Sequence, residues 1–264
     1  MKALAGKRIV ITRAAHQAGE LEQLLQERDA IPLLYPCIDI QPPQDAAPLR
    51  NALQALVDGK FDWLILTSTN TIRALKQRFD VMGIQAPVNL RVAAVGSATA
   101  QSAEEQLGLK VSAVPEKYRA EDLARTLQLA KNTRVLLPQS EIAEPTLATA
   151  LSNMGASVTT VVAYESVIGS GGVDLPRLLK RGEVDAITFT SGSTVTNLLQ
   201  RLAIEGGNRD LLEQVCLACI GDRTAEVTRQ NHLPVTVIAA QQTLEELVSA
   251  LEHYYAALAI GESK

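Results

Sequence analysis

Short apolar runs alternate with amphipathic segments along this chain. The runs have the length of buried strands, and the segments between them carry apolar residues three and four positions apart, as at Leu21, Leu24 and Leu25. This alternation is typical of parallel sheets covered by helices on both faces, so the pattern predicts an α/β fold. Strands are expected at 7–12, 31–35, 63–67, 91–95, 110–114, 134–137, 157–163, 186–190, 216–220 and 235–238, and helices at 18–27, 46–57, 71–79, 99–106, 120–129, 146–153, 174–181, 194–203, 224–230 and 244–255.

One stretch of this pattern occurs twice. A buried strand, a Thr-Ser turn and a helix at 61–75 recur at 184–198. Downstream, the strand at 91–95 is followed by Gly-x-x-Thr-Ala, and so is the strand at 216–220. The repeat predicts two units of one fold that hold one ligand between them.

Two segments interrupt the alternation. Four prolines surround residues 37–41, which favours extended chain, and a Gly/Ser tract at 169–172 predicts a flexible linker. Periodicity alone favours a cut near residue 132, because 134–140 resembles 8–14, whereas the two linkers would divide the chain into three pieces. Both observations hold if the first strand-helix-strand segment packs with the last third. The pattern leaves these arrangements open.

Composition is that of an ordinary globular protein. The chain has 264 residues, enough for two modest domains, with 47% hydrophobic and 20% charged residues. No apolar run approaches the length of a membrane span, and the chain enters a strand at once without a cleavable apolar segment, so a cytoplasmic protein without membrane contact is expected. The net charge of −4, the scattered Lys and Arg and the 3% aromatic content argue against nucleic acid as a partner.

The cysteines and histidines predict no metal or redox site. Cys216 and Cys219 have Cys-x-x-Cys spacing, but they lie in an apolar strand, where an offset of three turns side chains to opposite faces. We interpret them as buried structural thiols. The three histidines match no metal spacing.

The repeated turns are the candidate binding site. In open α/β sheets, ligands bind beyond the carboxyl ends of the strands, where helix N-termini present free N–H groups. Ordinary helix capping, worth about 1 kcal/mol per residue, is the alternative explanation of the polar residues there, but it does not require Gly followed by Thr in both copies. No nucleotide-binding signature follows any of the turns, which argues against ATP or dinucleotides. The candidate turn residues are Ser68, Asn70, Gly96, Thr99, Ser191, Ser193, Gly221 and Thr224.

Two further residues could act at such a site. Arg13 ends the first strand and could pair with a carboxylate, although an exposed Arg at a strand end is common. Tyr164 ends the strand before the Gly-rich tract, where it is either a packing residue or an acid in an interdomain cleft.

An ordered set of motifs resembles the uroporphyrinogen-III synthase family. The motifs are Ile-Thr-Arg-Ala, Leu-Thr-Ser-x-Asn, Ala-Val-Gly-x-x-Thr-Ala, Tyr-Glu-Ser, Phe-Thr-Ser-x-Ser and Cys-Ile-Gly-x-x-Thr-Ala, from about Gly6 to Leu251. The resemblance implies two similar flavodoxin-like parallel-sheet domains joined by a linker of two antiparallel strands. One domain would be discontinuous, 1–37 plus 168–264, and the other 40–164, with linkers near 36–41 and 163–172.

The resemblance also implies an activity. The family cyclises hydroxymethylbilane, with loss of water and inversion of the last pyrrole ring, to uroporphyrinogen III, and needs no cofactor. Hydroxyls and N–H groups of the turns would bind the substrate's carboxylate arms, and Tyr164, which matches the family's linker tyrosine, would assist departure of the hydroxide. A monomer that receives the linear tetrapyrrole from hydroxymethylbilane synthase is expected. Family members often carry Arg-Gly after the strand at 134–137, whereas this chain has Pro138-Gln139-Ser140-Glu141, which argues against an anion-binding role there.

Two rival functions remain at this point. A non-catalytic two-domain hinge protein could use the same turns to bind a small polycarboxylate, and it would bind ligand without forming product. A nucleotide-dependent transferase would need a phosphate loop, which the sequence lacks.

Overall fold

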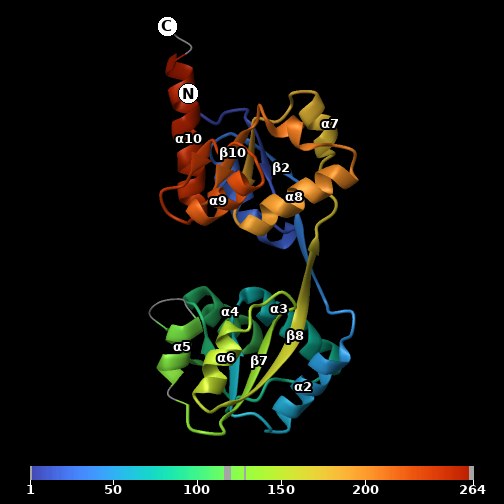
Figure 1. Cartoon of the computed structure of the whole chain (residues 1–264), viewed down its shortest axis with the longest axis vertical. Helices are drawn as coiled ribbons and strands as arrows, with labels where there is room; N and C mark the ends of the chain where they lie inside the picture. Colours follow the sequence, from blue (N-terminus) through green and yellow to red (C-terminus); the bar gives the residue numbers. More distant parts are fainter. Residues whose placement is uncertain (1, 116–119, 128, 262–264) are drawn as a thin grey trace. The chain divides into compact units, whose positions relative to one another are not determined.

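The computed structural model describes residues 2–115, 120–127 and 129–261. The chain forms two compact units, each described separately below (Figure 1). Unit 1 comprises Met1–Asp39 and Val167–Lys264, and unit 2 comprises Ile40–Ser166. That these units act as domains joined by linkers near 36–41 and 163–172 stays a prediction.

Unit 1 is a five-stranded sheet between two helical layers. The strand order is β11-β10-β9-β1-β2, and its pairings are all parallel. Helices α7, α8 and α9 pack on one face, and α1 and α10 pack on the other. The elements are β1 (Arg8–Ile11), α1 (Gly19–Gln26), β2 (Ile31–Leu34), α7 (Leu175–Lys180), β9 (Ala186–Phe189), α8 (Gly192–Ile204), β10 (Cys216–Cys219), α9 (Asp222–Gln230), β11 (Val237–Ile238) and α10 (Leu244–Gly261), with short 3₁₀ helices at Ala15–Gln17 and Arg209–Leu212.

Unit 2 has the same layers around a six-stranded sheet of order β3-β8-β7-β4-β5-β6. The pairings among β4 to β8 are parallel. Helices α2, α3 and α4 cover one face, and α5 and α6 cover the other. The elements are β3 (Ile38–Gln41), α2 (Ala47–Val57), β4 (Trp63–Leu66), α3 (Thr69–Met82), β5 (Arg91–Ala94), α4 (Ser97–Leu107), β6 (Val111–Ala113), α5 (Ala120–Leu127), β7 (Arg134–Ser140), α6 (Thr146–Asn153) and β8 (Ser157–Ile168).

The two sheets are the same arrangement with a permuted chain. Matching β9 with β4 and β1 with β7 aligns the order β11-β10-β9-β1-β2 with β6-β5-β4-β7-β8, and β3 is added at the edge of unit 2. In unit 1 the chain begins with β1 and β2, which are equivalent to β7 and β8 of unit 2. The equivalents of β4, β5 and β6 follow later in the chain as β9, β10 and β11. This permutation explains why both 61–75 and 134–140 have counterparts in unit 1. The predicted α/β fold with two similar parallel-sheet units is confirmed.

An aspartate before the central strand makes the same contact in each unit. The Asp62 carboxylate accepts the backbone N–H of Arg134, the first residue of β7, at 2.8 Å. The Asp185 carboxylate accepts the N–H of Arg8, the first residue of β1, at 2.7 Å. Each aspartate also donates its own N–H to the carbonyl of that arginine. The repeated Asp thus holds neighbouring strands in register at their amino ends.

The glycine tract is not the flexible chain that the sequence predicts. A Cβ on Gly169 would lie 2.2 Å from the Pro36 carbonyl oxygen, and one on Gly172 would lie 2.1 Å from that of Leu34. Val173 donates its N–H to the same Leu34 oxygen at 2.8 Å. These glycines are present because two backbone segments touch, which no side chain would allow.

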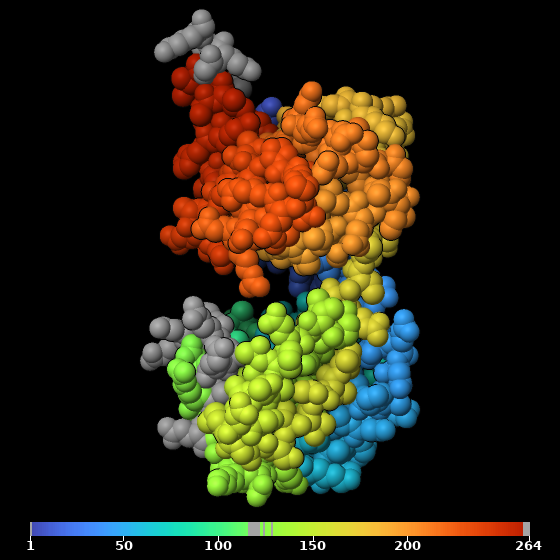
Figure 2. Space-filling view, in the orientation of Figure 1, coloured from blue at the N-terminus to red at the C-terminus, as the bar shows by residue number. Residues whose placement is uncertain are grey.

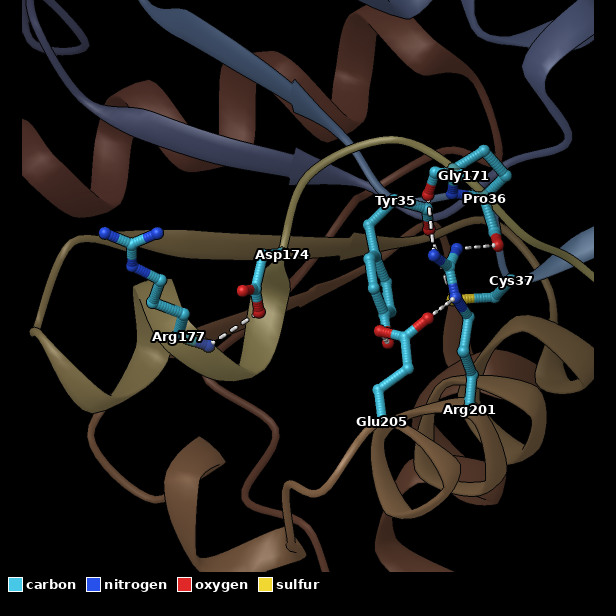
Figure 3. A network of polar contacts seen from close by, with 8 residues as sticks. All are labelled: Tyr35, Pro36, Cys37, Gly171, Asp174, Arg177, Arg201 and Glu205. Carbon is cyan, nitrogen blue, oxygen red and sulfur yellow. Dashed lines mark hydrogen bonds and ion pairs between the residues drawn. The ribbon is translucent and has the colours of Figure 1, made fainter.

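Arg201 of α8 completes this contact between the two segments (Figure 3). Its guanidinium donates to the carbonyl of Pro36 at 2.6 Å and to that of Gly171 at 2.6 Å. It also donates to Glu205 at 2.8 Å and lies 3.7 Å from the centroid of the Tyr35 ring. The Tyr35 hydroxyl donates to the second oxygen of Glu205 at 2.8 Å. A buried charge is thereby fully partnered, as burial requires. We call Tyr35, Arg201 and Glu205 the Arg201 cluster.

The cysteines are buried thiols on opposite faces of the unit 1 sheet, as predicted. Cys216 packs in the layer of α1 and α10, and Cys219 packs in the layer of α8 and α9. Burial raises the pKa of Cys216 to about 12, so the reactive thiolate is suppressed.

Helix α10 is buried along one side of its first half and exposed near its end. Its first half packs on the sheet through Leu247, Val248 and Leu251, whereas Leu258 and Ile260 near its end are 45% and 71% exposed. The last turns of this dark red helix extend beyond the rest of unit 1 (Figure 2). No helix among the described residues is long and apolar enough to cross a membrane.

Candidate functional site

The repeated turns lie in pairs at the carboxyl edges of the two sheets. In unit 2, Leu66 is the register partner of Ala94, and the N–H of Val95 donates to the Leu66 carbonyl at 3.0 Å. In unit 1, Phe189 is the partner of Cys219, and the N–H of Ile220 donates to the Phe189 carbonyl at 2.9 Å. Each unit therefore places its Thr-Ser turn beside its Gly-x-x-Thr turn, where open α/β sheets bind ligands.

The serines of the Thr-Ser turns cap their helices. The Ser68 hydroxyl accepts the N–H of Thr71 at 3.2 Å, and the Ser191 hydroxyl accepts the N–H of Thr194 at 3.3 Å. Gly96 and Gly221 occupy the equivalent capping positions of α4 and α9, without a side chain to accept an N–H. The first-turn N–H groups beside these glycines therefore have no side-chain cap to satisfy them, which suits an anionic ligand.

The other predicted turn residues lie within the first helical turns. Asn70 is in the first turn of α3, and Thr99 is in that of α4, where it is buried. Thr224 is likewise buried in the first turn of α9, whereas Ser193 at the start of α8 is exposed.

In unit 1 the two turns share a cavity of about 580 Å³. Its size is within the range of small-molecule sites, about 300 to 1,000 Å³. The predicted Ser191, Ser193 and Thr224 line it, together with Arg223 and Gln242, which the sequence analysis did not select. Gly221 adjoins Gln242, since a Cβ there would lie 2.8 Å from the Gln242 side chain.

Arg13 lies just past the end of β1, which pairs with β9 through Ile11 and Thr188. Its Nε is a buried side-chain nitrogen without a hydrogen-bond partner among the residues that the structure describes. Burial lowers the pKa of the guanidinium, and the charge of Glu20 partly opposes this effect. A buried donor without a partner is costly unless a ligand or water satisfies it, so Arg13 is suited to bind a carboxylate.

Tyr164 is within a strand and not at its end. The sequence predicts that the strand ends at Tyr164, whereas β8 continues to Ile168. The Tyr164 hydroxyl lies 3.3 Å from the Ser68 hydroxyl, and both side chains are half-buried. Ser191, the counterpart of Ser68, contacts Ser193 at 2.9 Å. Both serines therefore contact a neighbouring hydroxyl, Ser68 that of Thr71 at 3.0 Å, but the capping serine of unit 2 also contacts a phenol.

The segment Pro138 to Glu141 also differs from the prediction of a loop. Strand β7 continues through Gln139 to Ser140. The Glu141 carboxylate accepts the N–H of Ser166 at 2.8 Å and the hydroxyl of Ser140 at 2.8 Å. The carboxylate here serves a contact within the protein.

A second cavity lies in unit 2, and its lining includes residues that were not predicted from the sequence. It measures about 50 Å³ and is lined by Tyr164 and by one face of α3 that carries Arg73, Gln77 and Arg78. A signal for it exists in the sequence, because Gln77-Arg78 and Gln200-Arg201 occupy the same positions after Ser68 and Ser191.

Both cavities are lined by cationic and neutral side chains. Arg223 lines the cavity of unit 1, Arg73 and Arg78 line that of unit 2, and no carboxylate is among the lining residues described for either. Among the described residues, no group of three His, Cys, Asp or Glu side chains could hold a metal ion. The arrangement is suited to an anionic ligand.

Comparison with known proteins agrees with this chemistry. The family model "Uroporphyrinogen-III synthase HemD" matches residues 19–249. A uroporphyrinogen-III synthase from Synechococcus elongatus is 34% identical over 257 residues, which cover 95% of this chain and 96% of that protein. A putative uroporphyrinogen-III synthase from Methanothermobacter thermautotrophicus is 29% identical and covers 96% of this chain and 99% of that protein.

A solved structure has the same fold. A mutant uroporphyrinogen III synthase from Thermus thermophilus matches with a TM-score of 0.61 at 20% identity, covering 96% of this chain and 100% of that one. The two relatives each match over 95% or more of the chain. The chain belongs to the uroporphyrinogen-III synthase family.

Proposed function

We propose that this chain cyclises hydroxymethylbilane to uroporphyrinogen III, with loss of water and inversion of the last pyrrole ring. Family membership supports the reaction. The observation that carries the assignment of roles is the contact of the Tyr164 phenol with Ser68, at 3.3 Å. A phenol beside a turn that presents hydroxyls and a helix N-terminus supports a role as proton donor to a ligand bound there.

The substrate's carboxylate arms need local donors. A protein with a net charge of −4 does not attract a polyanion by its overall field. We assign arm binding to the turns, through the hydroxyls of Ser68, Ser191 and Ser193, the N–H groups beside Gly96 and Gly221, and the guanidinium of Arg13. Asn70, Thr99 and Thr224 belong to the same turns. Fixed donors cost no reorganisation during the reaction.

We assign the departure of water to Tyr164. The phenol donates a proton to the leaving hydroxyl, the carbon–oxygen bond breaks, and a cationic azafulvene remains. Attack by the last ring gives a spiro intermediate, which reopens and closes in the inverted sense. The proton that the free pyrrole carbon loses at the final closure equals the one that the phenol supplied, so the step is balanced with water as the only by-product.

The cellular setting is part of the proposal. We infer a monomeric cytoplasmic enzyme that takes its substrate from hydroxymethylbilane synthase, because the linear substrate closes without inversion when it is left in water. A short path between the two enzymes would limit that loss.

The decisive experiment supplies freshly made hydroxymethylbilane and separates type III from type I product by chromatography. Type III product is expected in excess of the type I that forms without enzyme. Type I alone, at the uncatalysed rate, would end the synthase assignment. Ligand binding without type III product would favour a non-catalytic protein that binds a polycarboxylate.

A further inference from the structure

The small cavity beside Tyr164 has the size of one acidic group. Its volume is about 50 Å³, and a buried water needs roughly 10 to 15 Å³ measured in the same way. The cavity therefore has room for a carboxylate with its short arm and is far below the roughly 300 Å³ of a site for a whole small molecule. Its walls come from the segment Ile40 to Pro43, helix α3 and the Ala163-Tyr164 part of β8.

The cavity is lined by positively charged side chains. Arg73 and Arg78 line it, and its described lining includes no Asp or Glu. Within the described part of the chain, Arg78 forms no ion pair. Two guanidinium groups and a phenol around a small space are donors that suit an anion.

Unit 1 has the same arginine with its carboxylate already in place. Arg201 is the tenth residue after the capping Ser191, as Arg78 is the tenth after Ser68, and each follows a Gln. The Glu205 carboxylate is bound by Arg201 at 2.8 Å and by the hydroxyl of Tyr35 at 2.8 Å (Figure 3). Tyr35 follows β2, and Tyr164 lies on β8, the strand equivalent to β2 in the sheet order.

Unit 2 lacks the carboxylate of this arrangement, and its tyrosine lies three positions beyond Val161, the register equivalent of Tyr35. The residue equivalent to Glu205 is Met82, at the end of α3, whose side chain packs against the hydrophobic core. An arginine and a tyrosine from equivalent elements thus line a cavity, and the acidic partner that unit 1 supplies from its own chain is missing. Unit 1 displays the ligand chemistry that the cavity in unit 2 would accept.

We propose that Arg78, with Arg73 and Tyr164, binds one carboxylate arm of the polycarboxylate substrate in this cavity. The inference rests on the proposed function for the identity of the substrate. A carboxylate held there anchors its pyrrole ring next to the phenol that supplies the proton. Arg78 is then a substrate-binding residue, and its counterpart Arg201 is a structural one.

The first test measures binding directly, with the stable porphyrin uroporphyrin III as the probe. Replacing Arg78 or Arg73 with Gln removes a charge-assisted contact, and we expect the Kd of the probe to rise about tenfold for each. Lys76→Gln is the matched control, because it removes one charge from the same helix and lies outside the cavity, paired with Asp80. Its Kd is expected to change less than about twofold.

The second test builds the carboxylate of unit 1 into unit 2. Met82→Glu places an acid at the position of Glu205, where it would compete with the substrate arm for Arg78. We expect this variant to raise the Kd of the probe and the KM of the reaction about tenfold, whereas Met82→Gln, of the same shape without the charge, stays close to the wild type. A folded Met82→Glu protein keeps the wild-type near-UV circular dichroism.

The two proposals fail in different ways. Wild-type Kd and KM in Arg78→Gln, Arg73→Gln and Met82→Glu would overturn the carboxylate site, even if the wild type forms type III product. A wild type without type III product, whose probe binding weakens in Arg78→Gln but not in Lys76→Gln, would overturn the proposed function and keep the anion site. If Lys76→Gln weakened probe binding as much as Arg78→Gln, the loss would come from the net charge of the helix, and the carboxylate site would be overturned.

Discussion

The two units share one sheet order and one pair of turns, yet they use the same arginine for different purposes. In unit 1, Arg201 is 5% exposed at its side chain and holds two backbone segments together with Tyr35 and Glu205. In unit 2, the equivalent Arg78 lines a cavity beside Tyr164. A duplicated element can therefore stabilise one copy of a fold and bind ligand in the other, depending on the residues that surround it.

The capping serines of the two units also differ in their contacts. Each capping serine contacts a small hydroxyl nearby, Ser191 that of Ser193 and Ser68 that of Thr71, but Ser68 also contacts the phenol of Tyr164, 96 residues away in the chain. Unit 1 provides a roomy cavity of about 580 Å³, and unit 2 provides a small one next to the candidate acid. The two units share a sheet order but differ in the side chains that surround their cavities.

The largest expected effect is on the free energy of unfolding, and it distinguishes Arg201 from Arg78. Arg201→Met leaves the carbonyls of Pro36 and Gly171 without this donor and leaves the Glu205 carboxylate with the Tyr35 hydroxyl but no counter-charge, so we expect a loss of about 3 kcal/mol in the free energy of unfolding. Arg78→Met, the same change in unit 2, should cost less than about 1 kcal/mol because its side chain is only half-buried. Urea unfolding followed by circular dichroism measures both.

The single tryptophan allows the unfolding of one unit to be followed on its own. Trp63 belongs to β4 of unit 2, so its fluorescence reports that unit, whereas circular dichroism reports both. If the units are separate domains, Arg201→Met shifts the circular-dichroism transition and leaves the Trp63 transition in place. Equal losses in Arg201→Met and Arg78→Met would contradict the assignment of a structural role to one arginine alone.

The next effect is on activity, and it distinguishes Tyr164 from the hydroxyls of the turns. Tyr164→Phe removes the proposed proton donor, and we expect kcat to fall about 100-fold or more, as for other general acids. Ser68→Ala, Ser191→Ala and Thr224→Ala remove one hydroxyl each and should lower kcat less than tenfold. Rates of type III product formation at saturating substrate decide this, with unfolding midpoints as the check on folding. Small and equal losses in all four variants would exclude a dedicated acid.

Local sequence patterns were sufficient to predict the turns. A strand, a Thr-Ser pair and an amphipathic helix specify a capped helix start with few long-range contacts, and Ser68 and Ser191 cap as expected. The pairing of these turns with the Gly-x-x-Thr turns followed from the parallel sheet. Whether Ser68 would reach Tyr164 could not be predicted, because it depends on how β8 packs across the unit.

Long-range contacts account for what sequence reasoning got wrong or missed. Glycine at 169 and 172 has the same sequence signature whether the chain is flexible or pressed against another segment, and only the position of Pro36 and Leu34 distinguishes the two. The Gln-Arg pairs at 77–78 and 200–201 extend the repeat of 61–75 and 184–198, and this can be seen in the sequence. That Arg201 would also bind the carbonyls of Pro36 and Gly171 could not be predicted, because both lie far from it in the chain.

The smallest expected effect concerns the aspartates that hold the strands in register. Hydrogen bonds from the side chain and backbone N–H of Arg134 lower the pKa of Asp62 to about 2, below the value of about 3.9 in an unfolded chain. A carboxyl with a lowered pKa in the folded state stabilises the fold above its unfolded pKa and loses that contribution as the pH falls through the folded pKa. Asp62→Asn should therefore be less stable than the wild type at pH 6, with the difference shrinking between about pH 4 and pH 2.

Urea unfolding followed by Trp63 fluorescence at several pH values measures this difference in unit 2, where Trp63 directly follows Asp62. The effect is small because the Arg134 side chain is half exposed and solvent screens the ion pair. Asp185→Asn makes the matched change in unit 1, where the carboxylate also accepts Lys7 at 2.9 Å, and Trp63 should not report it if the units unfold separately. An Asp62→Asn difference that is constant from pH 6 to pH 2 would show that the hydrogen bond to the Arg134 backbone, and not the charge of the aspartate, holds β7 beside β4.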